Sequence, residues 1–263
     1  METVISLNNL RSKTKKRKII NGQNVIIYQT EEPPVGTTFF FTGAMASLTI
    51  YDTLIQALLN QNQYVIGIYT NVLFPVEDNH RYRAEKIPEI FDSFHKCHPE
   101  LPNIYNLVGH SAGGKISLLV AAKYDVKRVT TVIALDPVDQ NPPAFTNTNL
   151  SSSNETDMNT TLFLNKPSFD NENFIDTNAT IILTQSGIYD EPSNAEAFLS
   201  AHNAAAIHAL NLDTIFIRHE NSSHNAYTDL IVENWENIIP SGDPEANAFA
   251  KQDALDLIQQ YIG

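Results

Sequence analysis

The sequence has little of what several classes of protein require. It contains one cysteine, Cys97, in 263 residues, which excludes an internal disulfide framework, a thiolate zinc site and a Cys-x-x-Cys redox motif. Its 17 Lys and Arg residues stand against 30 Asp and Glu residues, for a formal net charge of -13. This excess of negative charge argues against nucleic acid, or an anionic membrane, as the main partner.

Long apolar runs are also missing. No stretch approaches the roughly 18 apolar residues that a membrane-spanning helix needs, and the N-terminus lacks the apolar core of a signal peptide. Together with the single cysteine, these absences favour a soluble, intracellular protein. They leave a plastid location, a peripheral membrane contact and the oligomeric state open.

The few basic residues are concentrated near one end of the chain. Residues 11–18 hold six of the 17 basic residues, so 11 basic residues stand against 29 acidic ones in residues 19–263. Six like charges in eight residues repel one another. We therefore expect residues 1–19 to form a flexible arm and residues 20–263 to form one domain. A targeting signal or a lipid-surface contact is the alternative role for the basic run.

Apolar runs alternate with helical patterns through the rest of the chain. Strands are expected at 24–29, 38–42, 64–69, 104–108, 129–135, 180–184 and 214–217. Helices are expected at 51–62, 84–96, 112–124, 194–209 and 245–261. Unbroken apolar strands between helices predict an α/β fold, with a mostly parallel central sheet and helices on both faces.

One long segment does not follow this alternation. Residues 140–178 are rich in Asn, Ser and Thr and show no sustained periodicity. A loop of this length in a compact domain is usually functional or disordered. We expect a polar loop or lid insertion here, with a surface insertion that has no function as the alternative.

The strongest local motif is the Gly-x-Ser-x-Gly sequence around Ser111, formed by Gly109-His110-Ser111-Ala112-Gly113. It follows an expected strand and opens an expected helix, which is the context of a nucleophile elbow. The small residues let chain segments pass close to a strained turn, and the turn lifts the serine hydroxyl above the sheet. Ser111 is therefore the candidate nucleophile, and the amide of Ala112 is a candidate oxyanion donor.

A serine nucleophile needs a base, and the base needs an orienting acid, in the chain order Ser, acid, His. Asp136 ends the strand after the elbow helix, and Asp190 follows the next strand, so both are candidate acids; Asp139 is a weaker one. His224 lies in a polar loop after the last expected strand and is the favoured base, with His219 at the strand end as the alternative.

The second oxyanion donor is expected in the loop after the strand at 38–42. This loop reads Thr42-Gly43-Ala44-Met45-Ala46-Ser47, and its small residues would let a backbone amide approach a substrate carbonyl. By position the donor is the amide of Ala44 or of Met45.

With these residues in place, the chain resembles the α/β-hydrolases and is most similar to the chlorophyllase group. Gly-His-Ser-Ala-Gly-Gly-Lys at 109–115 resembles the Gly-His-Ser-Arg-Gly-Gly-Lys motif of that group, and Ile-Ala-Leu-Asp-Pro-Val-Asp at 133–139 resembles its Ile-Asp-Pro-Val motif. Pancreatic-type lipases look similar here too, with a Leu-Asp-Pro acid about as far from the serine. The resemblance implies that Asp136, 25 residues after Ser111, is the triad acid rather than Asp190.

The sequence departs from the chlorophyllase pattern at several points. Ala112 replaces the arginine after the nucleophile, Thr42 stands where the group has a histidine, and Gln140 replaces a glycine. The family histidine lies in a Gly-His-Met-Asp segment, where this chain has Ser223-His224-Asn225-Ala226. The motifs therefore specify hydrolase chemistry better than they specify chlorophyll.

The resulting prediction is a serine ester hydrolase that cleaves a carboxylic ester through an acyl-enzyme and needs no metal or organic cofactor. A chlorophyllase-like reaction, from chlorophyll to chlorophyllide and phytol, is favoured, with a lipase or general carboxylesterase as the alternative. The expected partner is a small apolar ester, for which Met45, Phe74 and Phe145 line either a pocket or the core. From another class, the rival is a non-catalytic hydrolase-fold binding protein.

Overall fold

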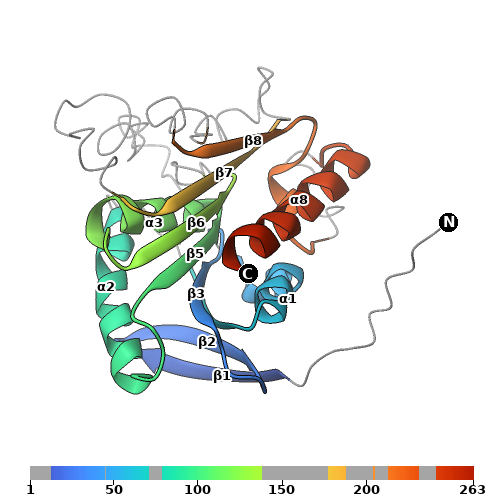
Figure 1. The fold of residues 1–263 in the computed structure, drawn as a ribbon. Helices are drawn as coiled ribbons and strands as arrows, with labels where there is room; N and C mark the ends of the chain where they lie inside the picture. The colour runs from blue at the N-terminus through green and yellow to red at the C-terminus, as the bar shows by residue number, and fades with distance from the viewer. Residues whose placement is uncertain are drawn as a thin grey trace, which may run out of the picture.

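An eight-stranded sheet forms the centre of the part of the protein that the structure, a computed structural model, describes (Figure 1). This part comprises residues 13–44, 46–70, 79–137, 177–187, 204, 213–230 and 241–263. The strands are β1 (Lys13–Ile20), β2 (Gln23–Thr30), β3 (Gly36–Phe41), β4 (Gln63–Ile68), β5 (Tyr105–His110), β6 (Val129–Leu135), β7 (Thr180–Ser186) and β8 (Ile215–His219). They are ordered β1-β2-β4-β3-β5-β6-β7-β8, and β2 runs in the direction opposite to the other seven of these strands.

Helices cover both faces of the sheet. They are α1 (Asp52–Asn60), α2 (Asn79–Cys97), α3 (Ala112–Leu119) and α8 (Pro244–Ile262), with short turns at η1 (Leu48–Tyr51), η2 (Val120–Tyr124) and η4 (His224–Tyr227). Figure 1 shows α2 and α3 on one side of the sheet and α1 and α8 on the other. The predicted α/β fold with helices on both faces is therefore confirmed.

The two hydrophobic cores explain why the central strands contain runs of successive apolar residues. Phe39 and Phe41 of β3 belong to the core under α2 and α3, whereas Phe40 belongs to the core under α1 and α8. Successive strand residues point to opposite faces, so a strand covered on both faces needs apolar residues at every position. All three phenylalanines are at most 1% exposed.

The expected strands and helices recur with small shifts where the chain is described. The helix expected at 112–124 ends as an α-helix at Leu119 and continues as the η2 turn, which is a π-helical segment. The helix expected at 194–209 lies outside the described residues, except for Ala204. The loop or lid at 140–178 also lies outside them, apart from its last two residues.

The N-terminal arm was predicted incorrectly in part. Residues 13–20 are not a flexible arm but form β1, which pairs with β2 along all eight of its residues. An edge strand leaves its side chains hydrated on both faces, so residues 14–19 keep their charges exposed to water, and lysines on an edge also discourage pairing with other chains. Lys15 Nζ lies 5.3 Å from the centre of the Tyr28 ring, which offsets part of the repulsion.

Candidate active site

Ser111 occupies a sharp turn between β5 and α3. Its backbone angles are φ 57° and ψ -124°, a region that non-glycine residues occupy only when the surrounding structure enforces it. The glycines on either side make the turn possible, because a Cβ on Gly109 would lie 2.3 Å from the Gly113 oxygen and one on Gly113 would lie 2.3 Å from the Phe41 oxygen. The predicted elbow geometry is therefore present.

Asp136 follows the last residue of β6, the strand next to β5. Its carboxylate is fully buried and accepts hydrogen bonds from the backbone amide of Ser186 at 3.2 Å and from the Ser186 hydroxyl at 2.5 Å. The Asp136 amide donates to the Thr184 carbonyl oxygen at 3.1 Å. These contacts with the end of β7 supply the partners that a buried carboxylate requires.

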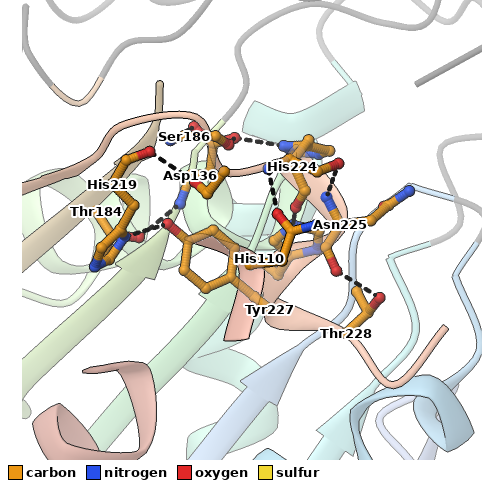
Figure 2. A network of polar contacts seen from close by, with 12 residues as sticks. His110, Asp136, Thr184, Ser186, His219, His224, Asn225, Tyr227 and Thr228 are labelled. Atoms are coloured by element: carbon orange, nitrogen blue, oxygen red, sulfur yellow. Dashed lines mark hydrogen bonds and ion pairs between the residues drawn. The ribbon is translucent and has the colours of Figure 1, made fainter. Parts of the chain in front are cut away.

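The imidazole of His224 completes this pair. His224 Nδ1 lies 2.6 Å from Asp136 Oδ2, and the His224 side chain is 6% exposed. Figure 2 shows the two side chains pointing toward each other beside Ser186. Because a carboxylate can only accept, Nδ1 carries the hydrogen and Nε2 of the neutral ring is left as the acceptor, the tautomer that a general base for serine needs.

The alternative base, His219, has both ring nitrogens engaged by side chains that are not among the candidate acids. His219, at the end of β8, has its Nδ1 2.8 Å from the Tyr227 hydroxyl and its Nε2 3.0 Å from Asp253 Oδ2 on α8, as Figure 2 shows in part. Asp139 and Asp190 lie outside the described residues. Of the candidate acids and bases, the structure brings together Asp136 and His224.

The loop after β3 lies against the elbow. A Cβ placed on Gly43 would be 3.3 Å from Ser111 Cβ, so the backbone of this loop passes close to Ser111. The Gly43 amide donates to the Tyr51 hydroxyl at 2.9 Å, which leaves the next amides, of Ala44 and Met45, as the candidate donors. Ala44 is partly exposed, and Met45 lies outside the described residues, as do Phe74 and Phe145.

Sequence reasoning missed two residues that hold this site together. Ser186 contacts Asp136, and Tyr51 contacts Gly43 and, through its hydroxyl at 2.8 Å, Nδ1 of His110. For Ser186 a signal existed, since Thr184-Gln185-Ser186 places polar residues at the carboxyl end of an otherwise apolar strand. For Tyr51 the sequence carries no such signal, because it reads as the first residue of an amphipathic helix.

A cavity of about 440 Å³ lies at the ends of β3 and β4. Phe41, Ile68 and Ile116 line it from the sheet and α3, and Arg83 and Lys86 line it from α2. Ser111, Asp136 and His224 do not line the cavity, so we do not assign it to the reacting part of a substrate.

The described residues show neither a metal-binding cluster nor a membrane span. No group of three or more His, Cys, Asp and Glu side chains in the described ranges is arranged to hold a metal ion. Within the same ranges, no helix combines the length and the apolar character that crossing a bilayer requires.

Comparisons with known proteins agree with the observed fold. Residues 51–170 match the family model described as the alpha/beta hydrolase fold. Among solved structures, the chain is similar to a dienelactone hydrolase-like promiscuous phosphotriesterase, P91, from metagenomic libraries, with a TM-score of 0.60 and 11% identity over 95% of this chain and 98% of that one. A search of curated proteins finds no match.

The chain has the α/β-hydrolase fold, because its strand order, its sheet and its helices agree with both findings. The family match over residues 51–170 supports a relationship to the α/β-hydrolase superfamily. The family match also supports a hydrolytic function, whereas the likeness at 11% identity concerns the fold alone.

Proposed function

We propose that the protein is a serine hydrolase of carboxylic esters. The single observation that carries the proposal is the buried Asp136–His224 hydrogen bond of 2.6 Å, in which Asp136 follows β6, the strand next to the one that ends in the strained turn at Ser111. A binding protein has no need for a strained serine or for a buried carboxylate directed at an imidazole. These features together support catalysis over the rival role of a non-catalytic binding module.

In the proposed reaction, the Ser111 hydroxyl oxygen attacks the ester carbonyl carbon as His224 Nε2 takes the hydroxyl proton. The amide of Ala112, with that of Ala44 or Met45, stabilises the oxyanion. The tetrahedral intermediate collapses, and the leaving alcohol receives the proton from His224. Water, deprotonated by His224, then releases the acid from the acyl-enzyme and the proton returns to Ser111. Asp136 orients His224 and stabilises its charged form.

The first test is covalent labelling by a fluorophosphonate probe. We expect the wild type to be labelled and Ser111→Ala to be unlabelled. Ser117→Ala is a matched control, because Ser117 is also buried on α3 but donates its hydroxyl hydrogen to the Gly113 carbonyl oxygen at 2.9 Å, and this variant should be labelled like the wild type. A wild type that no such probe labels would point to the binding-protein alternative.

For the substrate, we propose an apolar ester of the kind that chlorophyllases cleave. The support is the resemblance of the motifs around Ser111 and Asp136, which is weakened by Ala112 in place of the arginine. The test compares chlorophyll, a triglyceride and nitrophenyl esters by kcat/KM. Preference for chlorophyll, with release of phytol, is the expected result, and preference for either other class would identify a lipase or a general carboxylesterase.

A further inference from the structure

A continuous chain of buried hydrogen bonds connects the loop after β3 to His224 by way of His110. The Gly43 amide lies 2.9 Å from the Tyr51 hydroxyl, which lies 2.8 Å from His110 Nδ1. On the other side of the ring, His110 Nε2 lies 2.9 Å from the backbone oxygen of His224. Tyr51 is 1% exposed and His110 is 3% exposed, so water does not compete for these contacts.

The donor and the acceptor of every hydrogen bond in this series follow from the groups at its two ends. The carbonyl oxygen of His224 can only accept, so His110 Nε2 carries a hydrogen and Nδ1 is the acceptor. Tyr51 therefore donates to His110 and accepts from the Gly43 amide. Burial raises the pKa of the Tyr51 phenol, and burial together with the nearby His224 lowers the pKa of His110 to about 3. Both groups stay neutral, so this arrangement persists over the range in which a serine hydrolase works.

Two further contacts connect this series of hydrogen bonds to Ser111 and to the His224 ring. A Cβ on Gly43 would lie 3.0 Å from the Tyr51 hydroxyl oxygen and 3.3 Å from Ser111 Cβ, which leaves the loop little freedom to move relative to the elbow. The His110 ring also packs against the His224 ring, with centres 4.5 Å apart and planes 34° apart. The same two side chains therefore support the loop on one side and the base on the other.

We propose that Tyr51 and His110 are positioning residues that hold the oxyanion loop and His224 in one geometry. The inference rests on the proposed function and deepens it, since it assigns a role in the same reaction to residues that exchange no proton and form no bond with the substrate. Ester hydrolysis needs the loop amide and the imidazole placed at once around Ser111, and a displacement of about 1 Å in such a site can cost about 100-fold in rate.

Tyr51→Phe is the main test, because it removes one hydroxyl and leaves both the Gly43 amide and His110 Nδ1 without that partner. We expect kcat for a nitrophenyl ester to fall about 10- to 100-fold, with KM changed by less than about twofold, since the lost contacts serve the transition state more than binding. Tyr105→Phe is the matched control: Tyr105 is equally buried, and its hydroxyl bonds Asn103 and the Phe91 carbonyl oxygen on the α2 side of the sheet.

Two substitutions of His110 separate its hydrogen bond with Tyr51 from its hydrogen bond with the His224 oxygen. Asn can place an oxygen near the position of Nδ1 and keep the bond from Tyr51, whereas Gln can place an amide near the position of Nε2 and keep the bond to the His224 oxygen. We expect His110→Asn to disturb the base, shifting the acid limb of the kcat/KM–pH profile, which reports on the essential base. We expect His110→Gln to leave that limb in place and to lower kcat through the loop. The pair also provides a test if Tyr51→Phe fails to fold.

The outcomes separate this inference from the proposed function. A Tyr51→Phe enzyme whose kcat falls no further than that of Tyr105→Phe would overturn the positioning role, provided that Ser111→Ala is inactive. His110 variants that both keep the wild-type kcat and pH profile would overturn it as well. If the wild type and Ser111→Ala hydrolyse esters equally, the proposed function fails, and the positioning role fails with it.

Discussion

Replacement of Asp136 by Asn tests the proposed mechanism at the contact that carries it. In the wild type, Asp136 Oδ2 accepts from His224 Nδ1 at 2.6 Å and Oδ1 accepts from the Ser186 amide at 3.2 Å. An asparagine has only one side-chain oxygen for these two donors. If that oxygen faces the Ser186 amide, its NH₂ group faces His224 Nδ1, which must then accept. The imidazole hydrogen moves to Nε2, and the ring can no longer take the Ser111 proton.

The opposite orientation of the asparagine keeps the useful tautomer but places its NH₂ group against the Ser186 amide. Two donors then face each other in a fully buried position, where an unsatisfied polar group costs about 1–3 kcal/mol. The productive orientation is thus a minor one, and the negative charge that stabilises the His224 imidazolium is lost in both. For Ser-His-Asp sites the same change lowers kcat about 10⁴-fold. We expect a fall of about 10³- to 10⁴-fold here, with little change in KM.

The assay is steady-state hydrolysis of a nitrophenyl ester, with active sites counted by fluorophosphonate labelling. Asp253→Asn is a matched control, because Asp253 also contacts an imidazole nitrogen, that of His219, at 3.0 Å, but lies outside the proposed reaction. It should keep kcat within about threefold of the wild type, since it leaves the Asp136–His224 pair intact. An Asp136→Asn enzyme with wild-type kcat would refute the reasoning, and Asp190 would then be the acid to test.

Three other predictions concern pH and stability. The native pKa of His110, about 3, lies below the usual value, so the unfolded state binds a proton that the native state does not. The free energy of unfolding should therefore fall as the pH drops from about 6.5 toward 3, by up to about 1.4 kcal/mol per pH unit. In urea titrations, His110→Gln should remove this contribution to the dependence of the unfolding free energy on pH. Burial alone would raise the pKa of Asp229, but Lys251 and Thr53 hold it below its usual value. The stabilisation that Asp229 contributes to the folded state is therefore present above about pH 4 and is lost as the pH falls further. Asp229→Asn should accordingly flatten the plot of unfolding free energy against pH below about pH 4. Phe40→Ala should cost about 3–5 kcal/mol in the same measurement, because Phe40 is fully buried in the core under α1 and α8; a cost below about 1 kcal/mol would contradict this placement.

Local sequence patterns were enough to predict most of the fold. The strands β3 to β7 contain runs of apolar residues because both faces of the sheet are covered, as Phe39 and Phe40 illustrate. The elbow was predictable for a similar reason, since the steric demands of the turn restrict Gly109 and Gly113 to residues without a side chain. β1 was not predictable from its charges, because its place in the sheet depends on pairing with β2 and not on burial of its own side chains.

The site was predictable only where a residue's role is local to its own strand end. Asp136 and His224 could be proposed because each follows a strand in the required order, although they are 88 residues apart. Tyr51 could not, since its partner His110 lies 59 residues away in the sequence and no spacing encodes the contact. Ser186 stands at the polar end of β7, but the sequence does not identify Asp136, 50 residues away, as its partner. Such residues are identified by packing, which a single sequence does not contain.

The two adjacent imidazoles explain why we assign the base to His224 and not to His110, the histidine next to the proposed nucleophile. A proton on either ring opposes a proton on the other, because their centres are 4.5 Å apart, so the site favours only one cation. His110 is bonded to a phenol and to a carbonyl oxygen, both neutral, and its burial disfavours charge. His224 faces the Asp136 carboxylate at 2.6 Å, which stabilises an imidazolium. In the proposed reaction, the proton released by Ser111 therefore has one favourable destination, and His110 remains neutral beside it.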